Sequence, residues 1–347
     1  MPRNQVRFGL VGYGLFGRHH ARSISNHPDA SLVAIAVPSE ASQQAAKSDY
    51  PQADIYGDYR QLVARDDIDV VDVVVPNWQH YRVGLDALQA GKHLLLEKPM
   101  ALEVAHCDEL IALAAIKGRM LAIGHELRLS HLWGRIQTMI GDGVIGHPQY
   151  ALVELSRFPY RQGSGGWRYD LARVGNWILE EPIHFFDLAR WYLAPCGDPI
   201  SVYARANARR ADQPGLRDNL SCIVNFADGG YALVTQSLSA FGHHQTVKVS
   251  GTEGTIWGDW SGADARTDEP RFGLRYGLGE EVTEIRITQR AGELVELADE
   301  IGAVVRSLQD DSPIPCTGED GRWSTALCLA AQKSADTGEM VELRPND

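Results

Sequence analysis

The chain of 347 residues has ordinary apolar and charged fractions, 44% and 22%, and a net charge of −12. This length suffices for two domains with separate cores, and the acidic balance argues against nucleic acid or an anionic membrane as the main partner. No stretch approaches the roughly 20 apolar residues of a membrane-spanning helix, and the N-terminal residues lack a signal-peptide core.

The five cysteines are scattered along the chain and show neither a Cys-x-x-Cys pair nor a Cys/His spacing suited to a metal. An odd, dispersed set fits reduced thiols better than disulfides, so we expect a cytoplasmic globular protein without a bound metal. The histidine pairs at 19–20 and 243–244 are not followed by a further ligand at metal-binding spacing, and we interpret them as structural or solvated.

The first third of the chain alternates short apolar runs with helical patterns. Strands are predicted over residues 6–12, 32–37, 69–76, 93–99 and 119–125. Strands that are apolar on both faces and alternate with helices indicate a doubly wound parallel sheet. We therefore expect a first, α/β domain over residues 1–124.

After residue 124 the pattern changes to longer strand-like stretches with fewer helices between them. Residues 125–347 are predicted to form a second, α+β domain with a large, mostly antiparallel sheet, closed by C-terminal helices. A hairpin turn is expected at Asp228, Gly229 and Gly230. A helical pattern over residues 177–193 contains Pro182, which either interrupts the helix or lies in its first turn.

A glycine loop follows the first predicted strand and opens the first predicted helix. Its Gly12, Gly14 and Gly17 have G-x-G-x-x-G spacing, with Leu15 and Phe16 between them. The first glycine permits a tight turn, the second lets backbone N–H groups approach a pyrophosphate, and the third allows close packing of helix on strand. The loop predicts a Rossmann domain that binds a dinucleotide.

The end of the second strand bears on the choice between NAD and NADP. Val37 stands where an acidic residue would hold the NAD ribose, while Ser39 offers a hydroxyl to a ribose or a phosphate. Glu40 would disfavour the extra phosphate of NADP if it points inward, and the sequence has no arginine nearby. We therefore favour NAD over NADP, with both Val37 and Ser39 as cofactor-binding candidates.

Three motifs, GLVGYGLFG, VVVPNWQH and LLLEKPMAL, occur in an order and spacing that resemble the glucose–fructose oxidoreductase / inositol dehydrogenase / rhizopine-catabolism (Gfo/Idh/MocA) family. The stretches GNWILEEPIHFFDLARWYL and GEDGRWSTALCLAAQKSADTGEMVEL resemble its second domain and C-terminal helix, so the resemblance covers nearly the whole chain. It implies an NAD(P)-dependent dehydrogenase that oxidises, or reversibly reduces, a ring alcohol of a sugar, sugar derivative or cyclitol. It also implies a homodimer or homotetramer.

The resemblance implies that Lys98 of the E-K-P motif faces the nicotinamide and the substrate hydroxyl, and that His184 is the catalytic histidine. An ammonium stabilises developing alkoxide charge, and an imidazole suits transfer of the hydroxyl proton. Glu180 stands where the family usually has the shorter Asp, as a further catalytic or substrate-binding candidate: its carboxylate could orient the imidazole or bind a sugar hydroxyl. If one helix carries both residues, Glu180 and His184 share a face at i,i+4. Asp187, on the same stretch, is interpreted as structural.

Two further segments supply candidate binding residues. The resemblance makes the loop with Pro76, Asn77 and His80 a cofactor-contacting loop, and Glu97 either supports the nicotinamide side or fixes the loop by an ion pair. The stretch YRQGSGGWRYD is either a surface loop or a cap over the substrate. Its candidate substrate-binding residues are Tyr160, Arg161, Trp167 and Arg168.

Two other functions remain compatible with these residues. A glycosidase-like enzyme could retain NAD and use transient oxidation to eliminate a leaving group. Alternatively, a sensor could bind the dinucleotide without catalysis, although the intact Lys98 and His184 argue against it.

Overall fold

The computed structural model describes residues 5–159, 161–209, 212–238, 242–267 and 269–343. The chain forms two compact units, Met1–Glu126 with Leu297–Arg322, and Leu127–Glu296 with Trp323–Asp347. Among the described residues, no helix is long and apolar enough to cross a membrane.

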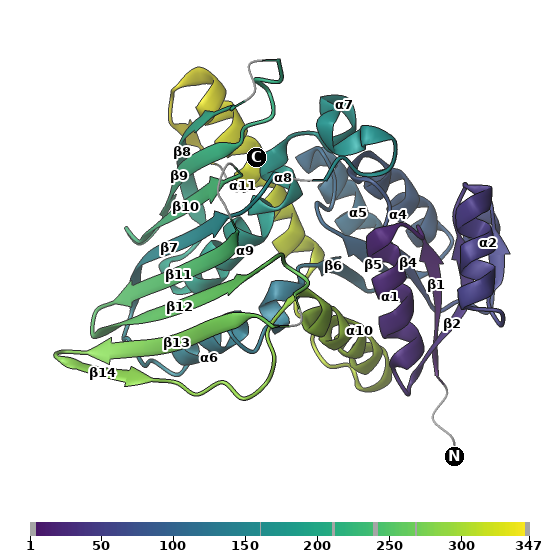
Figure 1. Cartoon of the computed structure of the whole chain (residues 1–347), viewed down its shortest axis with the longest axis horizontal. Helices are drawn as coiled ribbons and strands as arrows, with labels where there is room; N and C mark the ends of the chain where they lie inside the picture. The colour runs from purple at the N-terminus through teal and green to yellow at the C-terminus, as the bar shows by residue number, and fades with distance from the viewer. Residues whose placement is uncertain (1–4, 160, 210–211, 239–241, 268, 344–347) are drawn as a thin grey trace. The chain divides into compact units, whose positions relative to one another are not determined.

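The first unit is built on a parallel six-stranded sheet in the order β3-β2-β1-β4-β5-β6 (Figure 1). This is the strand order of a Rossmann fold, and it confirms the predicted doubly wound sheet. Its strands are β1 (Val6–Val11), β2 (Ala30–Ala36), β3 (Asp54–Tyr56), β4 (Val70–Val73), β5 (His93–Glu97) and β6 (Leu121–Gly124). Its helices are α1 (Leu15–Asn26), α2 (Glu40–Asp49), α3 (Tyr59–Val63), α4 (His80–Gln89) and α5 (Val104–Lys117), with the 3-10 turn η1 (Asn77–Gln79).

Apolar side chains bury both faces of this sheet. One core cluster includes Leu88 of α4 and Leu110 of α5, and the other includes Ile24 of α1. The second cluster also contains Ile301 and Val304 of α10 (Glu293–Asp310), so a helix from late in the chain completes the packing of the first unit. Parallel strands need this cover on both faces, which explains why the central strands are largely apolar.

The second unit contains a nine-stranded sheet in the order β14-β13-β12-β11-β7-β10-β9-β8-β15. Among the described strands of this sheet, β7 and β10 pair in parallel and all other neighbours are antiparallel, so the predicted, mostly antiparallel sheet is confirmed. Its strands are β7 (Pro148–Ser156), β8 (Pro199–Asn207), β9 (Asn219–Phe226), β10 (Tyr231–Ser237), β11 (His243–Gly251), β12 (Gly254–Gly262), β13 (Arg271–Leu278), β14 (Glu281–Glu284) and β15 (Val341–Glu342). The hairpin predicted around Gly229 joins β9 to β10.

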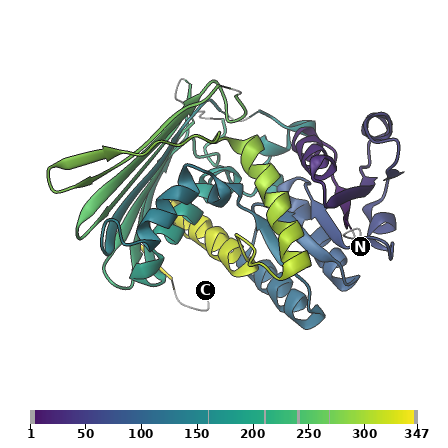
Figure 2. The same ribbon diagram turned by 90° about the horizontal axis from the view of Figure 1, so that it is seen from below.

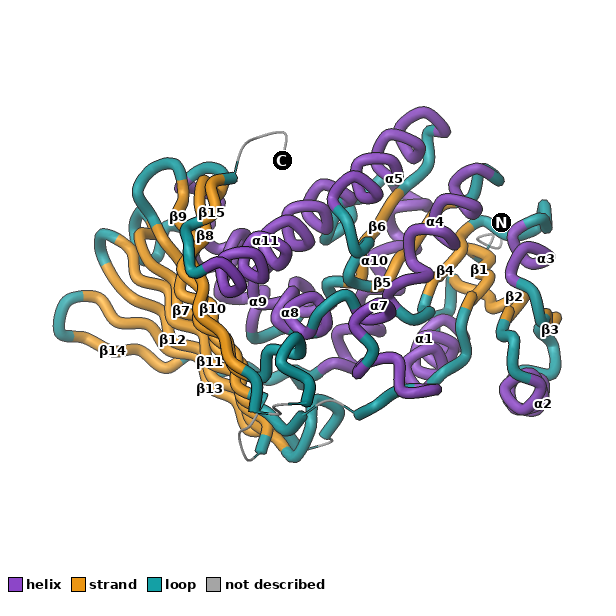
Figure 3. The backbone as a smooth tube through the Cα atoms, turned by 90° about the horizontal axis from the view of Figure 1, so that it is seen from above, coloured by secondary structure: helices purple, strands orange, loops and turns teal. Residues whose placement is uncertain are grey.

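Helices of the second unit cover one face of its sheet, as the edge-on views show (Figures 2 and 3). α9 (Pro182–Tyr192) packs on β7 and β10, and α6 (Trp133–Gly141) packs on β12. The unit also contains α7 (Leu171–Val174), α8 (Trp177–Glu180) and the part of α11 (Gly318–Thr337) from Trp323 onward, with the 3-10 turns η2 (Glu126–Leu129), η3 (Ser164–Tyr169) and η4 (Ala194–Cys196). Buried and more exposed residues alternate along β10, as expected for a strand with one covered face.

The helix predicted over residues 177–193 is in fact two helices. Asn176 caps α8, its side-chain oxygen accepting the Leu179 N–H at 2.8 Å, and α8 ends at Glu180. Glu181 has non-helical dihedral angles, and Pro182 is the first residue of α9, where its missing N–H removes no helical hydrogen bond. Glu180 and His184 therefore do not share the face of one helix, which corrects the i,i+4 expectation.

Candidate active site

The turn after β1 requires glycine at two positions because of the protein's own packing. Gly12 has a φ of 106°, and a Cβ there would stand 2.1 Å from the carbonyl oxygen of Val74. A Cβ on Gly17 would stand 2.2 Å from the carbonyl oxygen of Gly12. Both contacts are with backbone, which cannot swing away as a side chain can. The turn and α1 can therefore approach β1 and β4 closely only with these glycines.

Gly14 differs from its two neighbours in the motif. Its φ of −77° suits any residue, and no heavy atom lies within 4 Å of where its Cβ would be. It is the N-cap of α1, whose first N–H groups have no partner within the helix and favour an anion. This open approach to the helix N-terminus fits a dinucleotide pyrophosphate. Leu15 is 56% exposed beside it, whereas the Phe16 ring packs on His20.

At the end of β2, Val37 is buried and its N–H donates to the Tyr56 carbonyl at 2.9 Å. Ser39 is the N-cap of α2, and its Oγ accepts the Ser42 N–H at 3.4 Å. Glu40 is the exposed first residue of that helix. The hydroxyl and the carboxylate thus stand at the same exposed helix start.

The loop after β4 is tied to the E-K-P segment by His80. Its buried ring has Nδ1 2.6 Å from the Pro99 carbonyl oxygen and Nε2 2.7 Å from the Val75 carbonyl oxygen. Pro76 and the buried Asn77 lie between these contacts, at the start of η1. The His80 side chain therefore holds two loops together, both at the carboxyl ends of neighbouring strands.

Glu97 ends β5, and Lys98 follows it half-buried, with a cis peptide bond to Pro99. One Glu97 carboxylate oxygen accepts the Lys98 backbone N–H at 3.2 Å, and the other lies 3.2 Å from Nε2 of His20. Burial opposes ionisation of Glu97, but the hydrogen bond from His20 and the charges of His20 and Lys98 outweigh it and lower its pKa. The motif is thus built around a buried carboxylate that fixes the Lys98 peptide.

In the second unit, Glu180 is buried and its Oε1 accepts a hydrogen bond from Nε of Arg168 at 2.5 Å. The Arg168 guanidinium lies over the Trp167 ring, 4.6 Å from its centroid, and the Arg168 carbonyl accepts the indole N–H of Trp177 at 2.8 Å. The Trp167–Arg168 end of the glycine-rich stretch therefore packs against α8, whereas residues 161–162 and 164–165 are exposed. The extra methylene of Glu180, relative to Asp, lengthens its reach toward this arginine.

The other candidates of this stretch differ in their surroundings. Trp167 is buried, whereas Arg161 is exposed and lies 3.8 Å from Asp264. Tyr160 lies outside the described residues.

His184 is buried in the first turn of α9, and its backbone N–H donates to the Glu181 carbonyl at 3.1 Å. The Glu181 carboxylate pairs in turn with Arg157. Further along α9, both carboxylate oxygens of Asp187 accept hydrogen bonds from Arg128, each at 2.7 Å. This buried bidentate pair agrees with a structural role for Asp187.

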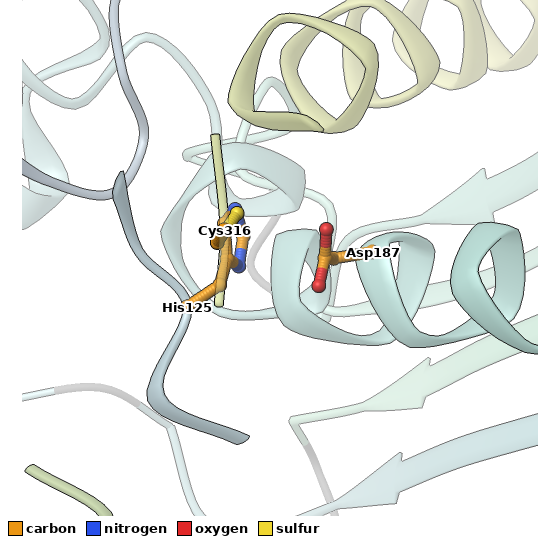
Figure 4. Close-up of side chains that lie close together, drawn as sticks. All are labelled: His125, Asp187 and Cys316. Atoms are coloured by element: carbon orange, nitrogen blue, oxygen red, sulfur yellow. The ribbon is translucent and has the colours of Figure 1, made fainter. Parts of the chain in front are cut away.

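Figure 4 shows three side chains from different parts of the fold. His125 follows β6, and Cys316 lies with it in the first unit, their nearest side-chain ligand atoms within 4.8 Å. Asp187, also labelled, lies on α9 in the second unit, where Arg128 and the Ser324 hydroxyl hydrogen-bond to it.

His20 and Asp72 were not singled out in the sequence, yet the structure places both beside Glu97 of the E-K-P segment. The two side chains meet at 2.9 Å although they are 52 residues apart in the chain. Asp72 did give a signal, because it interrupts an otherwise apolar strand of a parallel sheet.

Two family models match the chain. Residues 6–125 match a model described as an oxidoreductase family with an NAD-binding Rossmann fold, and residues 133–257 match the GFO/IDH/MocA C-terminal domain. A 1,5-anhydro-D-fructose reductase from Ensifer adhaerens is 27% identical over 97% of this chain and 98% of its own. An inositol 2-dehydrogenase from Rhizobium meliloti is 27% identical over 97% of this chain and 99% of its own.

Among solved structures, a putative myo-inositol dehydrogenase from Sinorhizobium meliloti 1021 is 25% identical and superposes with a TM-score of 0.82. The match covers 98% of this chain and 100% of that one. The two family models together span most of the sequence, and the strand order of the first sheet agrees with the Rossmann fold that the first model describes. The chain therefore belongs to the Gfo/Idh/MocA family of NAD(P)-dependent oxidoreductases.

Proposed function

We propose that this enzyme oxidises, or in reverse reduces, a secondary ring alcohol of a sugar, sugar derivative or cyclitol, with NAD favoured over NADP. The names of two relatives, a 1,5-anhydro-D-fructose reductase and an inositol 2-dehydrogenase, support this substrate class. The observation that carries the proposal lies in the first unit. Lys98 directly follows β5 of the Rossmann sheet. In the same sheet the strand order reverses between β1 and β4, where such folds bind dinucleotides, and the open N-cap at Gly14 follows β1.

A bound nicotinamide would take up the hydride from the alcohol carbon, or supply it in the reverse direction. Residues of the chain itself transfer the hydroxyl proton and stabilise the charge that develops on the substrate oxygen. Lys98 stabilises the developing negative charge on the substrate oxygen as an ammonium donor. His184 removes the hydroxyl proton through its imidazole and returns it in the reverse reaction.

Glu180 is assigned to substrate binding together with its arginine partner. The Arg168 guanidinium compensates the Glu180 carboxylate, which would otherwise be costly to keep ionised in a buried position. Paired in this way, the carboxylate can accept hydrogen bonds from sugar hydroxyls in a fixed direction. Trp167 and the exposed Arg161 are the further candidates of this stretch, for stacking and polar contact respectively.

The preference for NAD rests on the start of α2. Glu40 is exposed one residue after Ser39, and a carboxylate there would repel the additional phosphate of NADP. Residues 30–50 contain lysine but no arginine to compensate that phosphate.

The test is a panel of aldoses, inositols and glycosides, each incubated with the purified protein and with NAD or NADP. Formation of NADH from a polyol, with a higher kcat/KM for NAD than for NADP, supports the proposal. Dinucleotide binding without turnover of any polyol would instead indicate a sensor. Glycoside cleavage without net NADH would indicate transient oxidation followed by elimination.

We also propose that the chain forms a homodimer or homotetramer through the outer face of its large sheet. Ile200, Tyr203, Ile223 and Tyr231 of β8–β10 are each between 37% and 43% exposed, and Tyr203 pairs directly across from Ile223. Such an apolar strip on a sheet favours association. Light scattering should report a dimer or tetramer for the wild type and a smaller species for Tyr203→Lys with Ile223→Lys. A monomeric wild type would contradict this assembly.

A further inference from the structure

A buried set of ionisable side chains lies inside the first unit, and three of its members have no part in the chemistry proposed above. The set consists of His20 on α1, Asp72 on β4, Glu97 on β5 and Glu300 on α10. None of the four is more than 6% exposed. Charged groups are rarely buried unless they are paired, so the arrangement of these four calls for an explanation.

The His20 ring bridges two of the acids. Its Nδ1 lies 2.9 Å from a carboxylate oxygen of Asp72, and its Nε2 lies 3.2 Å from Oε1 of Glu97. Burial opposes the charged imidazole, but the charge of Asp72 and the hydrogen bonds to both acids outweigh it and raise the pKa of His20 well above its ordinary value. Both ring nitrogens are then N–H donors, one to each acid.

Glu97 links His20 to Lys98, the proposed catalytic lysine, because its carboxylate contacts both residues. Its second carboxylate oxygen accepts the backbone N–H of Lys98 at 3.2 Å. The Glu97 carboxylate also lies close to the β6 backbone at Gly124: a Cβ added there would stand only 2.8 Å from Oε1. A carboxylate held on both sides fixes the peptide from which the Lys98 side chain projects.

His20 also contacts the glycine loop. The Phe16 ring packs edge-on against the imidazole, with the ring centroids 4.9 Å apart. One buried side chain therefore touches both the loop that opens α1 and the acid that precedes Lys98. These segments are the two parts of the first unit on which the proposed reaction depends.

We propose that His20 is a positioning residue for Lys98, which it orients through Glu97 while holding the glycine loop through Phe16. The inference rests on the proposed function, in which Lys98 acts on the substrate oxygen. His20 is fully buried, so its influence on the reaction is indirect.

Other charged groups also face this cluster. Lys98 and His80 act on Glu97 from the ends of their loops, and Asp72 acts on it from β4. Burial and the charge of Glu97 raise the pKa of Glu300 well above its ordinary value, which favours the neutral form of this fourth acid. Any substitution of His20 changes the charge balance of the whole cluster, so the test must compare variants of equal charge.

Asparagine and glutamine at position 20 meet that condition. The Asn amide nitrogen reaches about as far as Nδ1 and can meet Asp72, whereas the Gln amide nitrogen reaches about as far as Nε2 and can meet Glu97. His20→Asn should lower kcat at least about tenfold, with KM and the cofactor Kd within about threefold, because a small misplacement of a reacting group is costly. His20→Gln should keep kcat within about threefold of the wild type. Equal losses in the two variants, or no loss in either, would overturn the proposal.

His19→Ala is the matched control. It removes an adjacent, only partly buried imidazole whose ring centroid also lies 6.4 Å from that of Phe16. This variant should keep the wild-type kcat. A loss equal to that of His20→Asn would show that packing around Phe16, and not the bond to Glu97, controls the rate.

A second readout does not depend on turnover. The rate at which an amine-reactive reagent labels Lys98, followed by peptide mass spectrometry, reports on the surroundings of its side chain, with Lys47 and Lys248 as internal references. His20→Asn should change the rate for Lys98 alone, and His20→Gln should leave it unchanged. If the wild type turns over no polyol, the proposed function fails, and this comparison still decides the role of His20.

Should His20→Asn not fold, Gly124→Ala perturbs Glu97 from the opposite side. It should change the labelling of Lys98 in the same selective way in protein whose circular dichroism is native. Unchanged Lys98 labelling in a folded Gly124→Ala protein would overturn the link through Glu97.

Discussion

Replacing Gly14 with alanine separates cofactor affinity from folding stability. The Gly14 backbone already has a φ that alanine adopts, and a Cβ there meets no heavy atom within 4 Å. The free energy of unfolding should therefore fall by less than about 1 kcal/mol, the difference expected from a poorer N-cap. The new methyl group would stand where we expect the pyrophosphate to approach α1.

Gly17→Ala is the contrasting variant in the same motif. Its Cβ would overlap the carbonyl oxygen of Gly12 at 2.2 Å, so the backbone must move. Such overpacking typically lowers the free energy of unfolding by about 1–3 kcal/mol. In Gly14→Ala, by contrast, the Kd for NAD should rise at least about tenfold, which corresponds to about 1.4 kcal/mol of binding free energy.

The assay pairs urea unfolding with calorimetric titration of NAD for the wild type and both variants. We expect Gly14→Ala to lose affinity at nearly unchanged stability and Gly17→Ala to lose stability. Wild-type affinity in Gly14→Ala would refute the argument that the open N-cap receives the dinucleotide. A stability loss as large as that of Gly17→Ala would refute the inference from the empty surroundings of Gly14.

Three further predictions concern buried charges. Arg168→Ala removes the partner of Glu180 and should raise KM for the polyol about tenfold with a smaller effect on kcat; steady-state kinetics with unchanged KM would argue against the assigned role of the pair. Arg128→Met leaves Asp187 buried without its bidentate partner and should lower the free energy of unfolding by about 3–5 kcal/mol. A decrease of less than about 1 kcal/mol, measured by urea unfolding, would contradict this. The third prediction concerns pH: because burial and the charge of Glu97 raise the pKa of Glu300, the folded protein keeps a proton that the unfolded chain releases above about pH 4.3. As pH rises, the free energy of unfolding of the wild type should therefore fall relative to that of Glu300→Gln. The fall should reach up to about 1.4 kcal/mol per pH unit until the pKa of Glu300 in the folded protein is passed. If urea unfolding shows a difference between the two proteins that does not change with pH, the prediction is wrong.

Local sequence signals were sufficient for the fold class, a parallel sheet in the first unit and a mostly antiparallel sheet in the second. The central strands of the first sheet are buried on both faces and therefore largely apolar, and the glycine loop and E-K-P mark strand ends. The hairpin at Gly229 was predictable because turn residues at that position select it. Short elements such as β3, with three residues, gave no periodicity to detect.

Side-chain partnerships distant in sequence were the part that could not be predicted. Glu97 and His20 are 77 residues apart, and only the strand order brings α1 next to β5. The reach of Arg168 to Glu180 depends on how the glycine-rich stretch folds, since Gly165 and Gly166 take positive φ values there. The break between α8 and α9 depends on Asn176 capping the first helix and on Pro182 starting the second.

The central claim is that Lys98 acts on the substrate oxygen while the glycine loop independently holds the dinucleotide. The most direct measurement compares Lys98→Ala with the wild type for kcat on the best polyol of the panel and for the Kd of NAD. We predict a fall in kcat of about a thousandfold or more, because a charge-stabilising donor is lost, with the Kd within about threefold. An unchanged kcat would contradict the account, as would a loss of activity fully explained by loss of NAD binding.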